Sequence, residues 1–357
     1  MTDATLRPKR FAYLDFLRIL AAFLVIVNHT NSLVFQKLTP ADGTWWLSIA
    51  WYYLSKTAVP LFVMISGACL LPRRDSYRRA FGRFARVLAV LVLFSYVYYV
   101  LGLMQTGWSW GQAVNLPAFL SSIWAQRITD SFWYLYFYLG LMVMLPMLQR
   151  LASAMDRQDL LYFMAVSFGV YAAWPLVTHY LPGLALPAYF DVPVFSVFVG
   201  LFFAGHYVHT VTRQPRPSLS ALVIVLSVGA SVLLTYLEVG RVAAGAKYWF
   251  MDERTAPSLF VVACSLAIML LSRGLFAARE PLGEKVNRRW ATAGACSFGI
   301  YLLQDLVIAQ TRYRFFTPLR GAINPFLAGL CWSLGVFAVA FAVAWLLKRV
   351  PLLRKLL

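Results

Sequence analysis

Long uninterrupted apolar runs are the feature that most constrains what this chain can fold into. They follow one another from residue 11 to residue 347 and are long enough for transmembrane helices, which need about 20 apolar residues each. The chain is 61% apolar and 13% charged, whereas soluble domains are about 45–50% apolar and about 25% charged. We therefore expect an all-α polytopic membrane protein, with residues 1–357 forming a single integral membrane domain.

The apolar runs predict about ten transmembrane helices. The second is expected to be bent or interrupted near Pro60 and Gly67, and a loop is expected from Gln105 to Asp130. The expected helices span residues 11–35, 45–71, 86–104, 131–148, 160–178, 192–209, 219–237, 257–272, 290–309 and 325–347.

The positive charges predict the orientation of these helices. The net charge is +18, and most Lys and Arg side chains lie in the segments on the same side as the N-terminus. The positive-inside rule places that side in the cytoplasm, and ten spans bring the C-terminus back to it. Because the charges form short clusters between apolar runs and no nucleic-acid-binding motif accompanies them, we expect no nucleic-acid partner.

The first helix carries charged and titratable residues that a simple anchor would not need. Asp15, Arg18 and His29 fall on one helical face, and Arg18 and His29 are separated by about three turns, roughly 16 Å along the axis. An Arg or Asp at the centre of a transmembrane helix costs about 2.5–3.5 kcal/mol on insertion scales, so such residues are functional candidates. Two other interpretations remain open: Asp15 and Arg18 neutralise each other, or His29 is a packing residue.

A second cluster of charge precedes the third expected helix. Residues 73–86 hold six arginines, and most of them suit anchoring or binding of lipid headgroups. Arg83 and Arg86 differ because they lie about one turn apart at the expected mouth of the helix. Two guanidinium groups on one face can bind phosphate oxygens in a bidentate manner. We predict an anion-binding role for this pair, with anchoring as the alternative.

Two further ionisable residues fall inside expected helices. Lys56 lies within the second helix and either extends toward the interface or faces a pocket. Asp305 in the ninth helix could orient an imidazolium or neutralise Arg18 or Lys56. The sequence contains no nucleophile elbow, Walker loop, dinucleotide fingerprint or metal-spaced His/Cys cluster, so we expect no metal.

Several of these stretches together resemble the acyltransferase 3 family of integral membrane O-acyltransferases. The family signature, a basic residue and a His separated by ten residues, matches Arg18 and His29 within LDFLRILAAFLVIVNH. VPLFVMISGACLL resembles its second helix, and Arg83 and Arg86 match its Arg-x-x-Arg motif. FWYLYFYLGLMVMLPML, which contains Trp133, and SFGIYLLQDLVI resemble later helices, although Gln304 stands where many members have His. The resemblance covers essentially the whole chain.

The resemblance implies an acyl-CoA-dependent O-acyltransferase of the bacterial cytoplasmic membrane. It would move an acyl group, most simply acetyl, from acyl-CoA to a hydroxyl of a cell-surface carbohydrate or lipid-linked glycan. His29 would be the general base, for which the ordinary histidine pKa of about 6.5 is suitable. Arg18 would position the donor, Asp15 would orient Arg18, and Arg83 and Arg86 would hold the donor phosphates. The candidate pocket residues are Lys56, Trp133, Gln304 and Asp305.

The remaining expectations concern partners and alternatives. No permanently bound cofactor is expected; acyl-CoA, the acceptor and the lipid bilayer are the expected partners, and the oligomeric state is left open. A glycan or lipid transporter or flippase would also suit a polytopic chain with intramembrane charges. Such a protein would move its substrate without breaking a thioester. A non-catalytic membrane subunit of a glycan-assembly complex is the third alternative.

Overall fold

The computed structural model confirms an all-α polytopic membrane protein. It describes residues 10–35, 38–105, 107, 110–125, 128–187, 196–211, 216–239, 258–279 and 281–356. The structure is 86% helical and contains no strand in these ranges. Nine helices in the described part are long and apolar enough to cross a membrane. The expected sixth span corresponds to a shorter apolar helix, α10 (Val197–Thr210), which begins after Ser196, an extended residue whose side chain caps the helix. The first residues of the expected span, up to residue 195, lie outside the described ranges.

The helices follow the apolar runs but differ from the expected boundaries at several ends. The other elements are α1 (Ala12–Phe35), α2 (Trp45–Ser55), α3 (Ala58–Leu70), α4 (Tyr77–Gln105), α5 (Trp110–Ala113), α6 (Leu116–Ala125), η1 (Asp130–Phe132), α7 (Trp133–Ala154), α8 (Arg157–Phe168), η2 (Gly169–Ala173), α9 (Trp174–Tyr180), η3 (Pro182–Leu184), α11 (Pro217–Val239), α12 (Leu259–Ala277), α13 (Glu284–Thr311), η6 (Arg312–Phe316), α14 (Thr317–Ala322), α15 (Pro325–Leu347) and α16 (Pro351–Leu356).

The expected interruption of the second span near Pro60 is confirmed, and two other expected boundaries were wrong. The span breaks at Lys56 and Thr57, between α2 and α3, and Pro60 lies four residues after Lys56, where its ring and missing N–H disfavour a continuous helix; Gly67 lies inside α3. α4 begins at Tyr77, nine residues before the expected start, because arginine is a good helix former and the charged stretch continues the helix beyond the apolar run. The expected loop from Gln105 to Asp130 contains the short helices α5 and α6.

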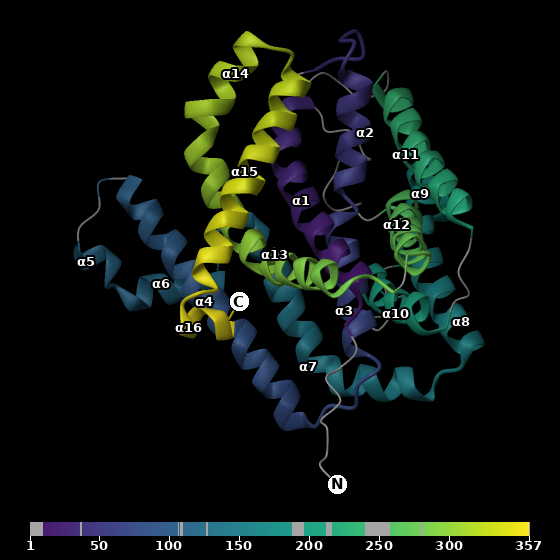
Figure 1. The fold of residues 1–357 in the computed structure, drawn as a ribbon. Helices are drawn as coiled ribbons and strands as arrows, with labels where there is room; N and C mark the ends of the chain where they lie inside the picture. Colours follow the sequence, from purple (N-terminus) through teal and green to yellow (C-terminus); the bar gives the residue numbers. More distant parts are fainter. Residues whose placement is uncertain are drawn as a thin grey trace.

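α1 is the central helix of the bundle. It packs against α13, α15, α3 and α2, and Figure 1 shows it behind α15 with the other helices around it. α4 is peripheral, with only 22% of its apolar window buried, and it contacts α7 and α16. In Figure 1, α4, α5 and α6 extend from the left of the bundle. Residues on α1 are therefore shielded, whereas α4 presents most of its surface outward.

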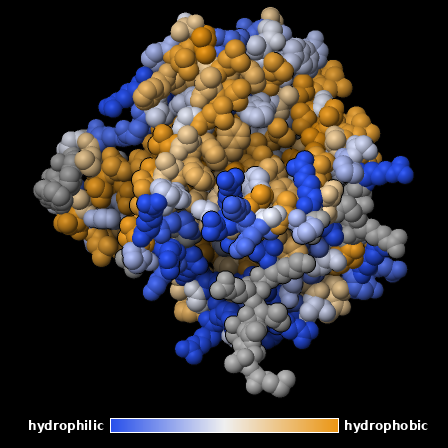
Figure 2. All heavy atoms as spheres, viewed as in Figure 1, coloured by the Kyte–Doolittle hydropathy of each residue, from blue (hydrophilic) through white to orange (hydrophobic). Residues whose placement is uncertain are grey.

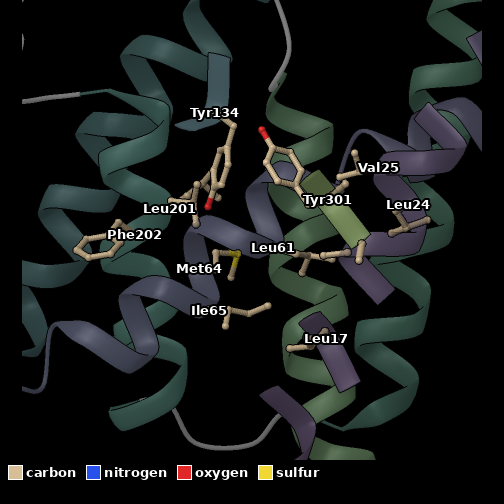
Figure 3. Close-up of a cluster of buried hydrophobic side chains, with 14 of the residues drawn as sticks. Leu17, Leu24, Val25, Leu61, Met64, Ile65, Tyr134, Leu201, Phe202 and Tyr301 are labelled. Carbon is tan, nitrogen blue, oxygen red and sulfur yellow. The ribbon is translucent and has the colours of Figure 1, made fainter. Parts of the chain in front are cut away.

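Small residues bring the central helices into close contact. Gly67 of α3 lies against the backbone carbonyl of Phe202 in α10, and Gly205 of α10 lies against that of Met64 in α3, so neither position has room for a Cβ. Such contacts replace the hydrophobic driving force that helices lack in lipid. Figure 3 shows the resulting core, with Met64 and Leu61 between Leu24 of α1 and Leu201 of α10.

Polar contacts register α1 with its neighbours along its length. Gly294 of α13 lies against Asp15, where an added Cβ would be 2.7 Å from Asp15 Oδ1. Farther along, Thr30 Oγ1 of α1 lies 2.7 Å from Ser333 Oγ of α15. At the same level Trp332 Nε1 of α15 donates to Thr311 Oγ1 of α13 at 2.8 Å. α1 and α13 thus run side by side in the same direction. The start of α1 and the end of α15 share one end of the bundle, since Arg10 and Lys348 line one cleft.

Candidate functional site

A cavity of about 490 Å³ opens at the end of the bundle where α1 begins. Its walls come from α1, α3, α4, α7, α13 and α16, so it is assembled from both halves of the chain. The side chains that line it are Arg18, Phe62, Ile65, Ser66, Cys69, Leu70, Arg73, Arg83, Arg86, Val87, Val90, Tyr134, Leu135, Tyr138, Met142, Ser297, Phe298, Tyr301 and Leu356. Three of the residues chosen from sequence, Arg18, Arg83 and Arg86, meet in this one cavity.

Arg18 is held in the cavity wall by an almost completely buried carboxylate. Arg18 Nη1 lies 2.6 Å from Asp15 Oδ1, and Nη2 lies 3.2 Å from the Sγ of Cys69. Asp15 is 1% exposed and also binds Arg10, whose Nε lies 2.7 Å from Oδ2. The pairing of Asp15 with Arg18, one of the interpretations left open by the sequence, is thus present, and Arg10 is a second guanidinium partner of the same carboxylate. Because one carboxylate neutralises only one of the two guanidinium groups, part of the positive charge of Arg18 remains available in the cavity that Arg18 lines.

Arg83 is positioned by a buried polar cluster that sequence analysis did not identify. Its Nη2 lies 3.1 Å from Asp75 Oδ2. Gln149 of α7 binds the same carboxylate through Nε2 at 3.1 Å, and its Oε1 accepts from the Asp75 backbone N–H at 3.0 Å. Gln149 is 1% exposed, so the cluster ties the turn between α3 and α4 to α7. It also limits the rotamers of Arg83 at the edge of the cavity.

Arg86 has a backbone partner from the C-terminal helix. Its Nε and Nη2 donate to the carbonyl oxygen of Leu356 at 3.2 and 3.1 Å. Leu356 also lines the cavity, so α16 covers part of its mouth. Arg86 is exposed, and this contact uses the same forked pair of donors that would bind an anion.

The inner end of the cavity is formed by tyrosines. Tyr134 of α7 and Tyr301 of α13 are the lining residues farthest from the arginines along their helices, and their rings lie 5.8 Å apart, edge to face. Both rings appear in Figure 3, where they face each other. Tyr301 Oη donates to the carbonyl of Ser131. The residue predicted from the sequence was the neighbouring Trp133; in a helix that is apolar and aromatic on every side, no local pattern distinguishes Tyr134 from it.

His29 does not line this cavity. It is half-buried on α1, between Asn28 and Thr30, in the half of the helix away from Arg18. The contact between Asp15 and Gly294 sets the register of α1 on α13, so Tyr301 lies level with Ala22, and His29 lies about 10 Å farther along the axis. The structure therefore places His29 beyond the tyrosine end of the cavity, on the side opposite the arginines.

Gln304 lies between these two levels. It is fully buried on α13, one turn beyond Tyr301, and neither of its amide atoms has a hydrogen-bond partner among the described residues. Buried polar groups are nearly always paired, so this amide points to a partner other than the described residues. Gln304 is thus a polar group along the line from the cavity to His29.

The remaining sequence candidates lie elsewhere. Lys56 sits in the break between α2 and α3 with its Nζ 4.5 Å from the centre of the Tyr52 ring, so its expected place well inside a helix was wrong. Trp133 packs on Phe198, with ring centres 5.7 Å apart. Asp305 Oδ2 accepts from Thr129 Oγ1 at 2.9 Å, and it forms no ion pair with Arg18. None of the three lines the cavity.

The cavity thus combines a cationic mouth with an apolar and phenolic interior. Arg18, Arg73, Arg83 and Arg86 supply four positive charges, and Asp15 and Asp75 offset part of them at the edge. An elongated ligand with an anionic head and an uncharged tail matches this order of surfaces.

The comparisons with known proteins agree with the resemblance seen in the sequence. The model of the acyltransferase domain known as acyltransferase 3 matches residues 11–349, nearly the whole chain. No curated protein matches the chain significantly, and no solved structure does. The match includes the first helix with Arg18, the start of α4 and the whole wall of the cavity except Leu356. The chain belongs to the acyltransferase 3 family of membrane acyltransferases.

Proposed function

We propose that this acyltransferase takes its acyl group from acyl-CoA, most simply acetyl-CoA, and delivers it to a hydroxyl of a carbohydrate or lipid-linked glycan. The observation that carries the proposal is the convergence of Arg18, Arg83 and Arg86 from two helices on one cavity. Acyl-CoA has phosphates at one end and a thioester at the end of a long, uncharged pantetheine arm. That order matches a cationic mouth followed by an apolar, tyrosine-lined interior.

The proposed donor pose runs from the arginines toward His29. Arg83 and Arg86 bind the phosphates, Arg18 faces the middle of the cavity, and the arm extends toward Tyr134 and Tyr301. Gln304 would supply the amide that meets the acyl end beyond the tyrosines, since its polar atoms have no hydrogen-bond partner in the described part of the chain. His29 lies farther along the same axis, where an acceptor from the opposite side of the bilayer would arrive. The cavity mouth would then face the cytoplasm of a bacterial cell.

The proposed chemistry is direct transfer with His29 as general base. The neutral imidazole takes the proton of the acceptor hydroxyl while its oxygen forms a bond to the acyl carbon. The bond from the acyl carbon to sulfur then breaks, and coenzyme A leaves as the thiol after it receives a proton. No acyl-enzyme intermediate is needed. Asp15 contributes by holding Arg18 in the wall of the cavity.

Replacement of Arg83 or Arg86 with alanine should raise the KM for acetyl-CoA. A lost charge-assisted contact is worth roughly 1.5–3 kcal/mol, which corresponds to about 10- to 150-fold. Binding can be measured separately by protection of Cys69 from a maleimide in a Cys331→Ser background, because Cys69 lines the cavity and Cys331 is exposed. Arg78→Ala is the matched control, since Arg78 is on the same helix and does not line the cavity.

If KM and the protection of Cys69 were unchanged in both variants, Arg83 and Arg86 would only anchor the helix at the membrane surface and would not bind the donor. The transporter alternative makes a different prediction: the cavity would bind its ligand, but purified protein would release no free coenzyme A thiol with any acceptor.

Removal of residues 351–357 should lower the KM for acyl-CoA several-fold and leave kcat unchanged. In the structure the carbonyl oxygen of Leu356 accepts hydrogen bonds from Nε and Nη2 of Arg86. A phosphate of acyl-CoA must displace this carbonyl to bind the same two groups. The measurement is steady-state kinetics of the truncated and full-length proteins in detergent. Arg354→Ala with Lys355→Ala is the control, because it removes charge from α16 but keeps the carbonyl contact. A higher KM after truncation would instead make α16 part of the binding wall.

A further inference from the structure

A second cationic region lies on the outer face of α13 and α15, apart from the donor cavity. It consists of two adjoining clefts of about 350 and 470 Å³ that share Thr292 and Trp345. Arg10, Lys348 and Arg349 line the first cleft, and Arg288 and Arg289 line the second. Neither cleft shares a lining residue with the donor cavity. We call the two together the α13–α15 groove.

The positive charge of this groove is largely uncompensated. Among the described residues, Arg288, Arg289, Lys348 and Arg349 form no ion pair with a carboxylate within 4.0 Å; Arg10 alone does, with Asp15. Lys348 Nζ donates to the carbonyl of Ala295 at 2.6 Å. Burial lowers the pKa of Lys348, and nearby Arg86 and Arg10 lower it further. An anion bound here would relieve this repulsion.

Apolar side chains line the groove beside these cations. Phe341 and Ala342 lie two turns before Lys348 and Arg349 on α15, about 10 Å farther into the span. Together with Ala293 of α13 they line the second cleft, next to Arg288 and Arg289. Trp345 lines both clefts, with Arg349 stacked on it at 3.7 Å. In Figure 2, hydrophilic residues gather across the middle of this face, over α13 and the end of α15, next to a hydrophobic expanse.

We propose that the α13–α15 groove binds an anionic phospholipid. The cations take the phosphate of the headgroup, and an acyl chain lies along Phe341, Ala342 and Ala293. A soluble phosphate would use the cations only and would not need the apolar surface beside them. Tryptophan at the boundary is the residue that membrane proteins place at headgroup depth. Basic pockets between helices on the cytoplasmic side commonly hold anionic headgroups in this way.

Two variants test the two halves of the groove separately. Arg289→Gln with Arg349→Gln removes two exposed charges from the head site. Ala342→Trp keeps every charge and fills the apolar part, where Ala342 is exposed and has room for a larger side chain. Arg150→Gln with Arg157→Gln is the matched control: it removes two exposed charges at the same end of the bundle but outside the groove.

The experiment is native mass spectrometry of the full chain released from mixed micelles of phosphatidylglycerol and phosphatidylcholine. The unmodified protein should retain phosphatidylglycerol in preference to phosphatidylcholine. The head-site variant should weaken this retention by roughly 20- to 30-fold, from the typical contribution of two basic residues near a membrane surface. Ala342→Trp should also lose it, and the control pair should keep it. Melting temperatures in detergent verify that all variants are folded.

Other outcomes would overturn the proposal. If the control pair lost phosphatidylglycerol as strongly as the head-site variant, the lipid would be attracted by net charge and not by this groove. If Ala342→Trp still retained phosphatidylglycerol and inorganic phosphate displaced the lipid, the cations would be a site for soluble anions. Absence of any preference for phosphatidylglycerol over phosphatidylcholine would show that the groove has no headgroup specificity. Acyl-transfer activity is not part of this test, so its result is independent of the proposed reaction.

Discussion

Replacement of His29 with alanine should abolish acyl transfer while the protein still inserts into the membrane. The loss of a general base lowers the rate by about 10²–10⁴-fold. His29 is half-buried on the central helix, beyond the tyrosine end of the donor cavity, where the acyl group and an acceptor from the opposite side would meet. The measurement is release of coenzyme A thiol together with the mass gain of the acceptor, both normalised to folded protein.

Two variants distinguish a general-base role of His29 from a packing role. His29→Gln keeps a polar side chain of similar reach but has no basic ring nitrogen, so it should be as inactive as the alanine variant. His206→Ala is the control, because His206 is also half-buried in an apolar helix but lies on α10, outside the cavity wall. Near-normal turnover in stably inserted His29→Ala would contradict the assignment of His29 as the base.

Replacement of Arg18 with lysine should remove most of the turnover, although the charge is kept. Arg18 uses one donor on Asp15 and a second toward Cys69, and its planar group faces the cavity from this fixed position. Lysine is a single point donor on a flexible chain and cannot reproduce this fork. If Arg18 served only to neutralise Asp15, lysine would largely suffice. The measurement is the acyl-transfer rate per folded, membrane-inserted protein.

The double variant Arg18→Met with Asp15→Leu completes this test. It removes the buried acid and its partner together, so no charge is left alone in the bilayer, and Arg10 remains as an exposed cation that still donates to Ala291. The variant should insert and melt near the unmodified protein but lose most of its activity. Full activity would exclude both residues from the active site and leave His29 as the remaining candidate on α1.

The sequence by itself determined the class of fold, the family and the identity of the cationic residues. Long apolar runs predict spans because a helix is the simplest way to satisfy backbone hydrogen bonds in lipid, and this inference is local to each run. The pairing of Asp15 with Arg18 is local in the same sense, since three residues make one turn. Arg83 and Arg86 were found by their spacing. These predictions required no knowledge of which helices are neighbours.

The tertiary structure alone decided which of these residues meet. Helices that are apolar on every side carry little information about the face that packs inward, so Tyr134 could not be chosen over Trp133 from the pattern. Gln149 holds Asp75, the partner of Arg83, and Leu356 binds Arg86; both contacts join distant segments, which no local pattern reveals. The depth of His29 relative to the cavity likewise follows from the close packing of Gly294 on Asp15. Local periodicity encodes helices, whereas the close contacts of small residues between helices set their register and hence the site.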